Sequence, residues 1–111
     1  MLLRPWLELH LETGDVPGLE WVDRSRSMFR ILWKHRSKGN WTSLHGAVFV
    51  EWAKNTGRYS DNMDSRPNYA HLKTRLRCAI NKAPDIEEVE SLTNMRAYEP
   101  FKVYKFLPKP G

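Results

Sequence analysis

Hydrophobic and polar positions along the chain follow two periods, one typical of helices and one typical of strands. A first helix is expected at residues 4–13, where Pro5 suits the first helical position. Trp6 and Leu9 would share its buried face, and Gly14 offers a stop. The chain is therefore expected to open with an amphipathic helix.

Alternation of apolar and polar residues then predicts two strands that are close enough to form an antiparallel hairpin. The first strand is expected at residues 19–23, with Leu19 and Trp21 on one side. The second is expected at residues 28–33, and its apolar side would hold every second residue: Phe29, Ile31 and Trp33.

The rest of the chain predicts two further helices and two further strands. One helix is expected from Ser43 to about residue 55, and its buried face would hold residues four apart: Leu44, Val48 and Trp52. Another is expected at residues 69–82, ended by Pro84. Strands are expected at residues 86–91 and 101–107. The pattern indicates an α+β fold of one domain over residues 1–111, ordered from about 4 to 108, with a linker beginning at 108–111.

The helix expected at residues 69–82 has a narrow apolar stripe and a wide basic face. The stripe holds Leu72, Leu76, Ala79, Ile80 and Ala83. The wide face holds Lys73, Thr74, Arg75, Arg77, Cys78, Asn81 and Lys82. Arginine can bond guanine, asparagine can bond adenine, and small side chains can contact the thymine methyl group. This face fits a recognition helix in a DNA major groove, braced by the preceding helix and flanked by a two-stranded wing. A basic helix that binds nothing is the alternative.

Net charge is concentrated in the same part of the chain. The protein has 111 residues and a formal charge of +5. Residues 24–82 hold thirteen basic and three acidic residues, which gives +10, whereas residues 1–23 carry −4 and residues 83–111 carry −1. This concentration is typical of a protein that binds a polyanion, and a basic surface kept for solubility is the alternative.

Other classes of protein are disfavoured by what the sequence lacks. No apolar stretch approaches the roughly 18 residues of a membrane span, and Glu8 and Glu12 interrupt the block that a signal peptide requires. One cysteine and four unpaired histidines predict no disulfide, metal site or other cofactor. Because no nucleophile elbow, phosphate-binding glycine loop or pair of acids is present, we expect no enzyme.

The five tryptophans, Trp6, Trp21, Trp33, Trp41 and Trp52, are expected mainly in the core. Trp33 and Trp41 border a basic loop at residues 34–42, where an indole N–H could donate to a phosphate. The same loop contains His35, whose imidazole would fit a narrow minor groove.

Several motifs together resemble the DNA-binding domain of the interferon regulatory factors. They are RPWLE at 4–8, PGLEW at 17–21, WKH at 33–35, FVEWA with TGRY at 49–59, LKTRLRCAINKAPDIEEV at 72–89 and FKVYKFLP at 101–108. The resemblance covers essentially the whole chain and includes all five tryptophans in order. Leu72 stands where the family usually has a further tryptophan.

The resemblance implies a winged helix-turn-helix with three helices packed on a four-stranded antiparallel sheet. It implies that the third helix reads GAAA-type sequences of interferon-response elements in the major groove. By position, the base contacts would be Arg77, Cys78, Asn81 and Lys82. His35 would enter the minor groove. Contacts to the phosphate backbone would come from Trp33, Trp41, Arg58, Lys73 and Arg75.

Three functional hypotheses follow from these observations. The first is a sequence-specific domain of a nuclear transcription factor that binds double-stranded DNA, beside a second copy or other factors on tandem sites. The resemblance implies that such a domain belongs to a longer factor, which could shuttle from the cytoplasm. The second is a truncated or viral-type competitor of such factors, and the third is a tryptophan-rich module that binds acidic peptides.

Overall fold

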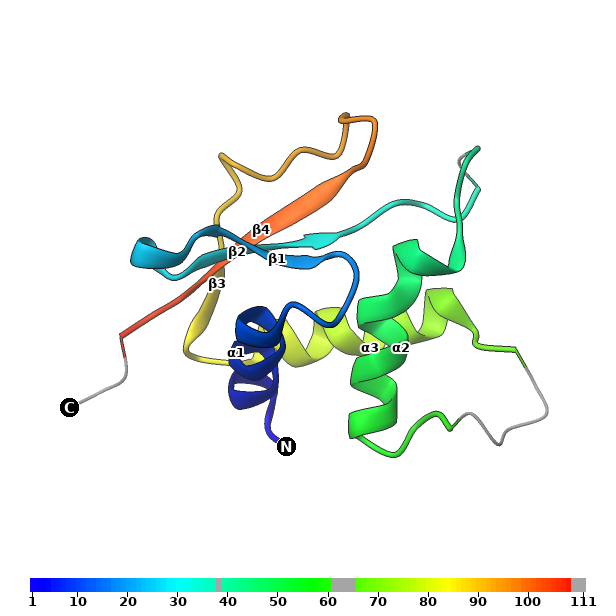
Figure 1. Ribbon diagram of the computed structural model, residues 1–111, viewed down its shortest axis with the longest axis horizontal. Helices are drawn as coiled ribbons and strands as arrows, with labels where there is room; N and C mark the ends of the chain where they lie inside the picture. Colours follow the sequence, from blue (N-terminus) through cyan, green and yellow to red (C-terminus); the bar gives the residue numbers. More distant parts are fainter. Residues whose placement is uncertain (38, 61–65, 109–111) are drawn as a thin grey trace.

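The computed structural model describes residues 1–37, 39–60 and 66–108, and it places three helices on one face of a four-stranded sheet (Figure 1). The helices are α1 (Leu3–Thr13), α2 (Ala47–Asn55) and α3 (Tyr69–Lys82). The strands are β1 (Leu19–Asp23), β2 (Met28–Leu32), β3 (Ile86–Glu88) and β4 (Phe101–Phe106). The expected α+β architecture is confirmed. Within the expected linker at 108–111, residues 109–111 lie outside the described part of the chain.

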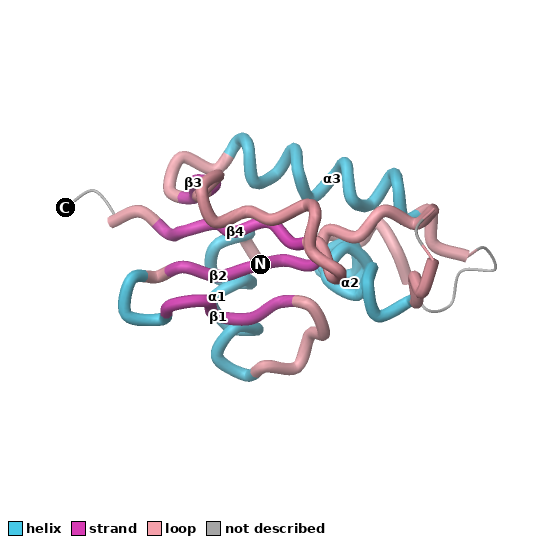
Figure 2. The backbone as a smooth tube through the Cα atoms, turned by 90° about the horizontal axis from the view of Figure 1, so that it is seen from above, coloured by secondary structure: helices cyan, strands magenta, loops and turns pink. Residues whose placement is uncertain are grey.

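The sheet is antiparallel throughout, with the strand order β1-β2-β4-β3 (Figure 2). Phe29 on β2 faces Trp21 on β1 and Tyr104 on β4. The expected hairpin of β1 and β2 is therefore present, and its middle row brings three aromatic residues together across neighbouring strands.

The core between the sheet and the helices contains several aromatic pairs among its aliphatic residues. Phe29 of β2 and Phe106 of β4 stack with ring centroids 4.7 Å apart on the same face of the sheet. Trp6 of α1 meets Trp52 of α2 edge to face at 5.3 Å. Each large ring removes a wide apolar area from water, so these few contacts supply much of the driving force for folding.

Helix α1 buries a different face from the one expected. Trp6, Leu7 and Leu11 are buried, but Leu9 is 43% exposed, so the pairing of Trp6 with Leu9 was wrong. Apolar residues occur on both sides of this helix, and the side that carries Leu7 and Leu11 is the one that is buried. The stop at Gly14 is confirmed, because this residue adopts the left-handed conformation with a φ of 65°.

Helix α2 begins later than expected, after a 3-10 turn at Ser43–Gly46. A 3-10 turn advances about 120° per residue instead of 100°, so the face predicted for a continuous α-helix does not hold at its start. Leu44 is consequently 60% exposed, and its predicted burial was wrong. Val48 and Trp52 are buried as expected.

Helix α3 has the predicted bounds. The side chain of Asn68 accepts a hydrogen bond from the His71 amide at 3.1 Å, and Pro84 follows the helix.

Strand β3 is shorter than expected because the chain turns after it, with the Leu92 amide donating to the Val89 carbonyl at 3.0 Å. Strand β4 ends one residue earlier than expected, at Phe106.

The Arg4 side chain links α1 to the residues that follow α3 and β4. Arg4 donates to the Leu107 carbonyl at 2.8 Å and to the Asp85 carboxylate at 3.2 Å. Because Asp85 lies just after α3, this contact holds the end of that helix against α1.

The aromatic core makes a prediction about stability. Trp52→Ala should lower the free energy of unfolding by about 3–5 kcal/mol, because it deletes a buried indole and leaves a cavity beside Trp6. Denaturant unfolding followed by circular dichroism measures the change. Leu44→Ala is the control: this residue precedes α2 but is exposed, so its loss should cost no more than about 0.5 kcal/mol. A Trp52 variant as stable as the wild type would contradict the core assignment.

Candidate nucleic-acid interface

The sequence-predicted base-contact residues lie together on the solvent side of α3. Arg77, Cys78, Asn81 and Lys82 are all exposed, because Leu72, Leu76 and Ile80 face the core. In the described part of the chain, neither Arg77 nor Lys82 is paired with a carboxylate. The face therefore presents cations and hydrogen-bonding groups that are available to a ligand.

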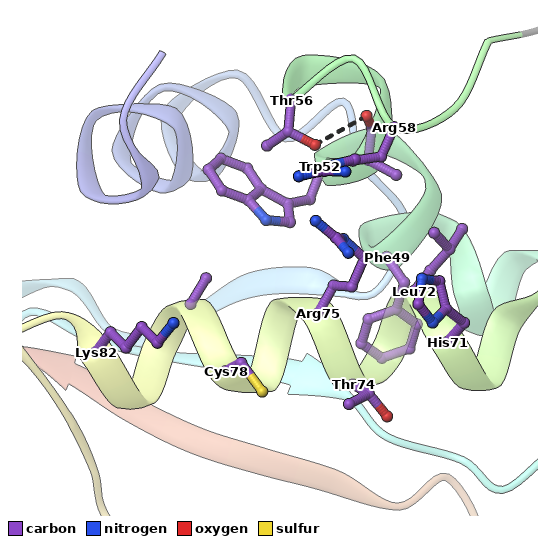
Figure 3. Close-up of a pocket in the computed structure, with 12 residues that line it drawn as sticks. Phe49, Trp52, Thr56, Arg58, His71, Leu72, Thr74, Arg75, Cys78 and Lys82 are labelled. Carbon is purple, nitrogen blue, oxygen red and sulfur yellow. Dashed lines mark hydrogen bonds between the residues drawn. The ribbon is translucent and has the colours of Figure 1, made fainter.

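A groove of about 540 Å³ separates α3 from α2 (Figure 3). Its floor is apolar, with Phe49 and Trp52 among the lining residues, and its rim carries Arg58, Arg75 and Lys82. Arg75 is half-buried and extends from α3 toward α2, whereas Arg58 is exposed after α2 (Figure 3). The predicted phosphate contacts Arg58 and Arg75 thus line the same groove beside the exposed face of α3.

Lys73, in the first turns of α3, makes a cation–π contact with Trp33. The Lys73 ammonium lies 5.8 Å from the Trp33 ring and donates to the Lys34 carbonyl at 3.2 Å. On the same ring, the Lys102 ammonium lies 4.6 Å from the centroid. Burial, together with the nearby charge of Lys102, lowers the pKa of Lys73 from its ordinary value of 10.5. Trp33 itself is buried, so its ring serves mainly to position two cations.

His35 is exposed, and its ring orientation is determined by its own loop. The Ser37 amide donates to His35 Nδ1 at 3.2 Å, and the Ser37 hydroxyl lies 2.7 Å from the same nitrogen. Because Nδ1 accepts, the proton of the neutral ring lies at Nε2. The ring therefore presents one N–H donor to solvent, which suits the acceptors on the floor of a minor groove.

The remaining tryptophans divide between the core and the basic loop. Trp6, Trp33 and Trp52 are buried, whereas Trp21 and Trp41 are half-buried. Trp41 packs edge to face on Tyr69, the first residue of α3, with centroids 4.8 Å apart. It thus joins the loop after β2 to the start of α3.

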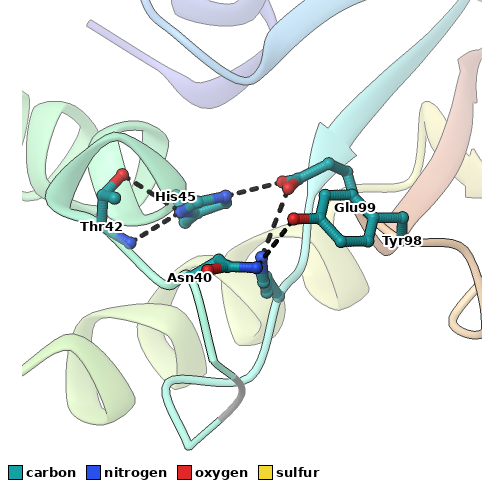
Figure 4. A network of polar contacts seen from close by, with 6 residues as sticks. Asn40, Thr42, His45, Tyr98 and Glu99 are labelled. Atoms are coloured by element: carbon teal, nitrogen blue, oxygen red, sulfur yellow. Dashed lines mark hydrogen bonds and ion pairs between the residues drawn. The ribbon is translucent and has the colours of Figure 1, made fainter.

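A polar network around the buried Lys34 holds the loop after β2 against the loop before β4 (Figure 4). Lys34 is only 3% exposed, and its ammonium lies 3.3 Å from the Glu99 carboxylate. His45 Nδ1 accepts from the Thr42 amide at 2.8 Å, so His45 Nε2 carries the proton and donates to Glu99 at 2.6 Å. One carboxylate therefore anchors the residue before His35 and the turn before α2.

The balance of effects at Glu99 favours its charged form. Burial alone would raise the pKa of Glu99, but hydrogen bonds from His45 and Lys34 outweigh it and lower the pKa below its ordinary value of 4.5. In the same region, Asn40 donates to the Tyr98 hydroxyl at 2.7 Å, which adds a further link between the two loops.

No pattern in the sequence predicted this network. Glu99 is 54 residues from His45 and 65 residues from Lys34, and no local period relates them. The only signal was the isolated acidic residue in front of a strand that carries two lysines, Lys102 and Lys105.

Two findings concern other classes of site. Within residues 1–37, 39–60 and 66–108, no helix combines the length and apolar character needed to cross a bilayer. In those same ranges, no cluster of three His, Cys, Asp or Glu residues is arranged to hold a metal ion.

The Glu99 network predicts a dependence of stability on pH. Glu99 loses its proton at a lower pH in the folded state than in the unfolded chain. Its contribution to the free energy of unfolding is therefore complete above about pH 5 and is lost as the pH falls through the pKa of the folded state. Thermal unfolding of Glu99→Gln should therefore show a shallower loss of stability between about pH 5 and pH 3 than the wild type.

His45→Gln is the matched variant for this experiment, because it removes one of the two groups that stabilise the carboxylate. Its curve should lie between those of the wild type and Glu99→Gln. Identical slopes for the wild type and Glu99→Gln would contradict the role assigned to the carboxylate.

Comparison with known proteins agrees with this geometry. A family model described as "Interferon regulatory factor transcription factor" matches residues 2–107. Human interferon regulatory factor 8 is 40% identical over 108 residues, which is 96% of this chain and 25% of that protein. Human interferon regulatory factor 1 is 37% identical over 109 residues, which is 97% of this chain and 33% of that protein. The chain thus spans about a third or less of these curated relatives.

Solved structures show the same fold. The crystal structure of IRF-3 bound to the interferon-b enhancer superposes with a TM-score of 0.86 at 30% identity, over 97% of this chain and 98% of that one. The DNA-binding domain of viral vIRF-1 shares the fold at 16% identity, with a TM-score of 0.73. The family match over nearly all of the chain and the shared fold show that this chain belongs to the interferon regulatory factor family of transcription factors.

Proposed function

We propose that this chain is the sequence-specific DNA-binding domain of a nuclear transcription factor, and that it reads GAAA-containing elements with α3 in the major groove. The observation that carries the proposal is the exposed face of α3, where Arg77, Cys78 and Asn81 stand beside cations on a helix, Tyr69–Lys82, that contains no Asp or Glu. These residue types match the hydrogen-bonding and methyl groups of base edges. The IRF-3 structure, solved on the interferon-b enhancer, supports binding of duplex DNA by this fold.

The remaining contacts divide into two kinds. Lys82 would extend the base contacts at the end of α3, and His35 would donate into the adjacent minor groove. Trp41, Arg58 and Arg75, together with the pair of Lys73 and Trp33, would contact the phosphate backbone. Backbone contacts fix the position of the domain and base contacts supply specificity. A second copy or another factor on a tandem site would bind beside it.

Selection of bound sequences from a random duplex pool tests the proposed function. Enrichment of GAAA cores is the expected result. A pool that shows no enrichment, together with saturable binding of an acidic peptide, would instead favour a protein-interaction module. Enrichment of GAAA cores could also come with no effect of the natural full-length chain on a reporter gene, neither activation nor repression. This result would favour a competitor of such transcription factors.

Arg77 makes a prediction about specificity. Arg77→Ala should weaken binding to a GAAA duplex by about 1–3 kcal/mol and relax the base preference at one position, because a bidentate contact to a base is lost. Fluorescence anisotropy with single-base variants of the duplex measures both effects. An equal loss on a scrambled duplex would show that Arg77 contacts phosphate.

Lys73 makes a prediction about salt dependence. Lys73→Ala should weaken binding to all duplexes by a similar factor, and the slope of log K against log salt should fall by roughly one. Lys73→Met keeps the apolar stem over Trp33 and removes only the charge, so it should give the same change in slope. Unchanged slopes in both variants would exclude a phosphate contact at Lys73.

A further inference from the structure

Arg36 is a cation that the sequence analysis did not select, and the structure holds it on an aromatic surface. Its guanidinium lies 5.5 Å from the centroid of the Trp41 ring and 5.4 Å from that of the Tyr69 ring. The side chain is exposed, and no carboxylate among the described residues pairs with it. A cation–π contact uses the charge of a guanidinium and leaves N–H groups for another ligand.

The aromatic surface under Arg36 is itself fixed in place. Trp41 and Tyr69 meet edge to face, and Gly46 lies beneath the Tyr69 ring. A Cβ atom at residue 46 would overlap that ring, so only glycine allows this approach without a shift. The guanidinium is therefore held by rings from two different segments, and part of the entropy lost on ordering an arginine is already lost in the free protein.

Arg36 lines a cavity of about 270 Å³ between the loop after β2 and the start of α3. The cavity is also lined by Lys34, His35 and Lys73, and none of its lining residues is acidic. Lys73 is the residue that the proposed function assigns to the phosphate backbone. Three cations therefore line the cavity. Lys34 is paired with Glu99, which leaves the ammonium of Lys73 on α3 and the planar guanidinium of Arg36 on the loop.

We propose that Arg36 is a further DNA-binding residue, and that Arg36 and Lys73 together bind one backbone phosphate at this cavity. The inference rests on the proposed function, because it requires a duplex along α3. A phosphate matches a stacked guanidinium, since two parallel N–H groups can bind two of its oxygens. One of the two rings that Arg36 contacts belongs to Tyr69, the first residue of α3, so the guanidinium lies close to the start of that helix.

The test compares Arg36→Ala with the wild type on a GAAA duplex and on a scrambled duplex across a range of salt concentrations. We expect affinity to fall about tenfold on both duplexes at low salt, and the salt slope to fall by roughly one. Arg24→Ala is the matched control, because Arg24 is an exposed arginine in the turn between β1 and β2, at the far end of the sheet (Figure 1). It should bind as the wild type does.

A second variant separates charge from geometry. Arg36→Lys keeps the charge but loses the planar fork, so its affinity should lie between those of the wild type and Arg36→Ala. Circular dichroism and the melting temperature of each variant confirm that the fold is retained.

Two results would overturn the inference while leaving the proposed function intact. The first is binding by Arg36→Ala that equals that of Arg24→Ala on both duplexes. The second is a loss confined to duplexes with A·T flanks, which would make Arg36 a reader of the minor groove. Wild-type affinity that does not respond to salt on either duplex would overturn the proposed function, and this inference with it.

Discussion

The rotation of α3 about its own axis is the constraint on which the whole interface depends. Leu72, Leu76 and Ile80 are buried at successive turns, and Leu76 is fully enclosed. With these three residues directed into the core, helical geometry leaves Arg77 and Asn81 no direction except toward solvent. A rotation by one residue would expose a leucine and bury a cation, so hydrophobic burial determines which side chains a ligand meets.

Aromatic rings then place the cations around that helix. Trp33 contacts Phe49 in the core at 5.2 Å and carries Lys73 and Lys102 on its ring. At the outer side, Trp41 and Tyr69 carry Arg36. Rings that stabilise the fold thus also set the positions of positive charges. This dual use applies to Trp33 and Trp41, two of the five tryptophans.

Local signals predicted the elements well and their faces less well. The end of α3 was accessible because Pro84 is a strong local signal for the end of a helix. Leu9 was misplaced because periodicity finds a helix without deciding which of two apolar sides meets the sheet, and Leu44 was misplaced because a 3-10 turn takes the place of the first turn of the expected α-helix. The exposed residues of α3 were predicted together because they lie on one segment. The Glu99 network and the stacking of Arg36 were not, since each joins side chains that only the tertiary fold brings together.

The position of Lys73 has a consequence for hydration. A lysine on an open surface is surrounded by water, and a contact with an anion must strip part of that shell away. Lys73 already lacks part of its shell, because one N–H group binds the Lys34 carbonyl and the ammonium lies over the rings of Trp33 and Phe49. Folding has thus already removed water from the Lys73 ammonium that would otherwise be removed when an anion binds. Fewer water molecules remain to be released from this ammonium when an anion arrives, and its lowered pKa records the same loss of solvent.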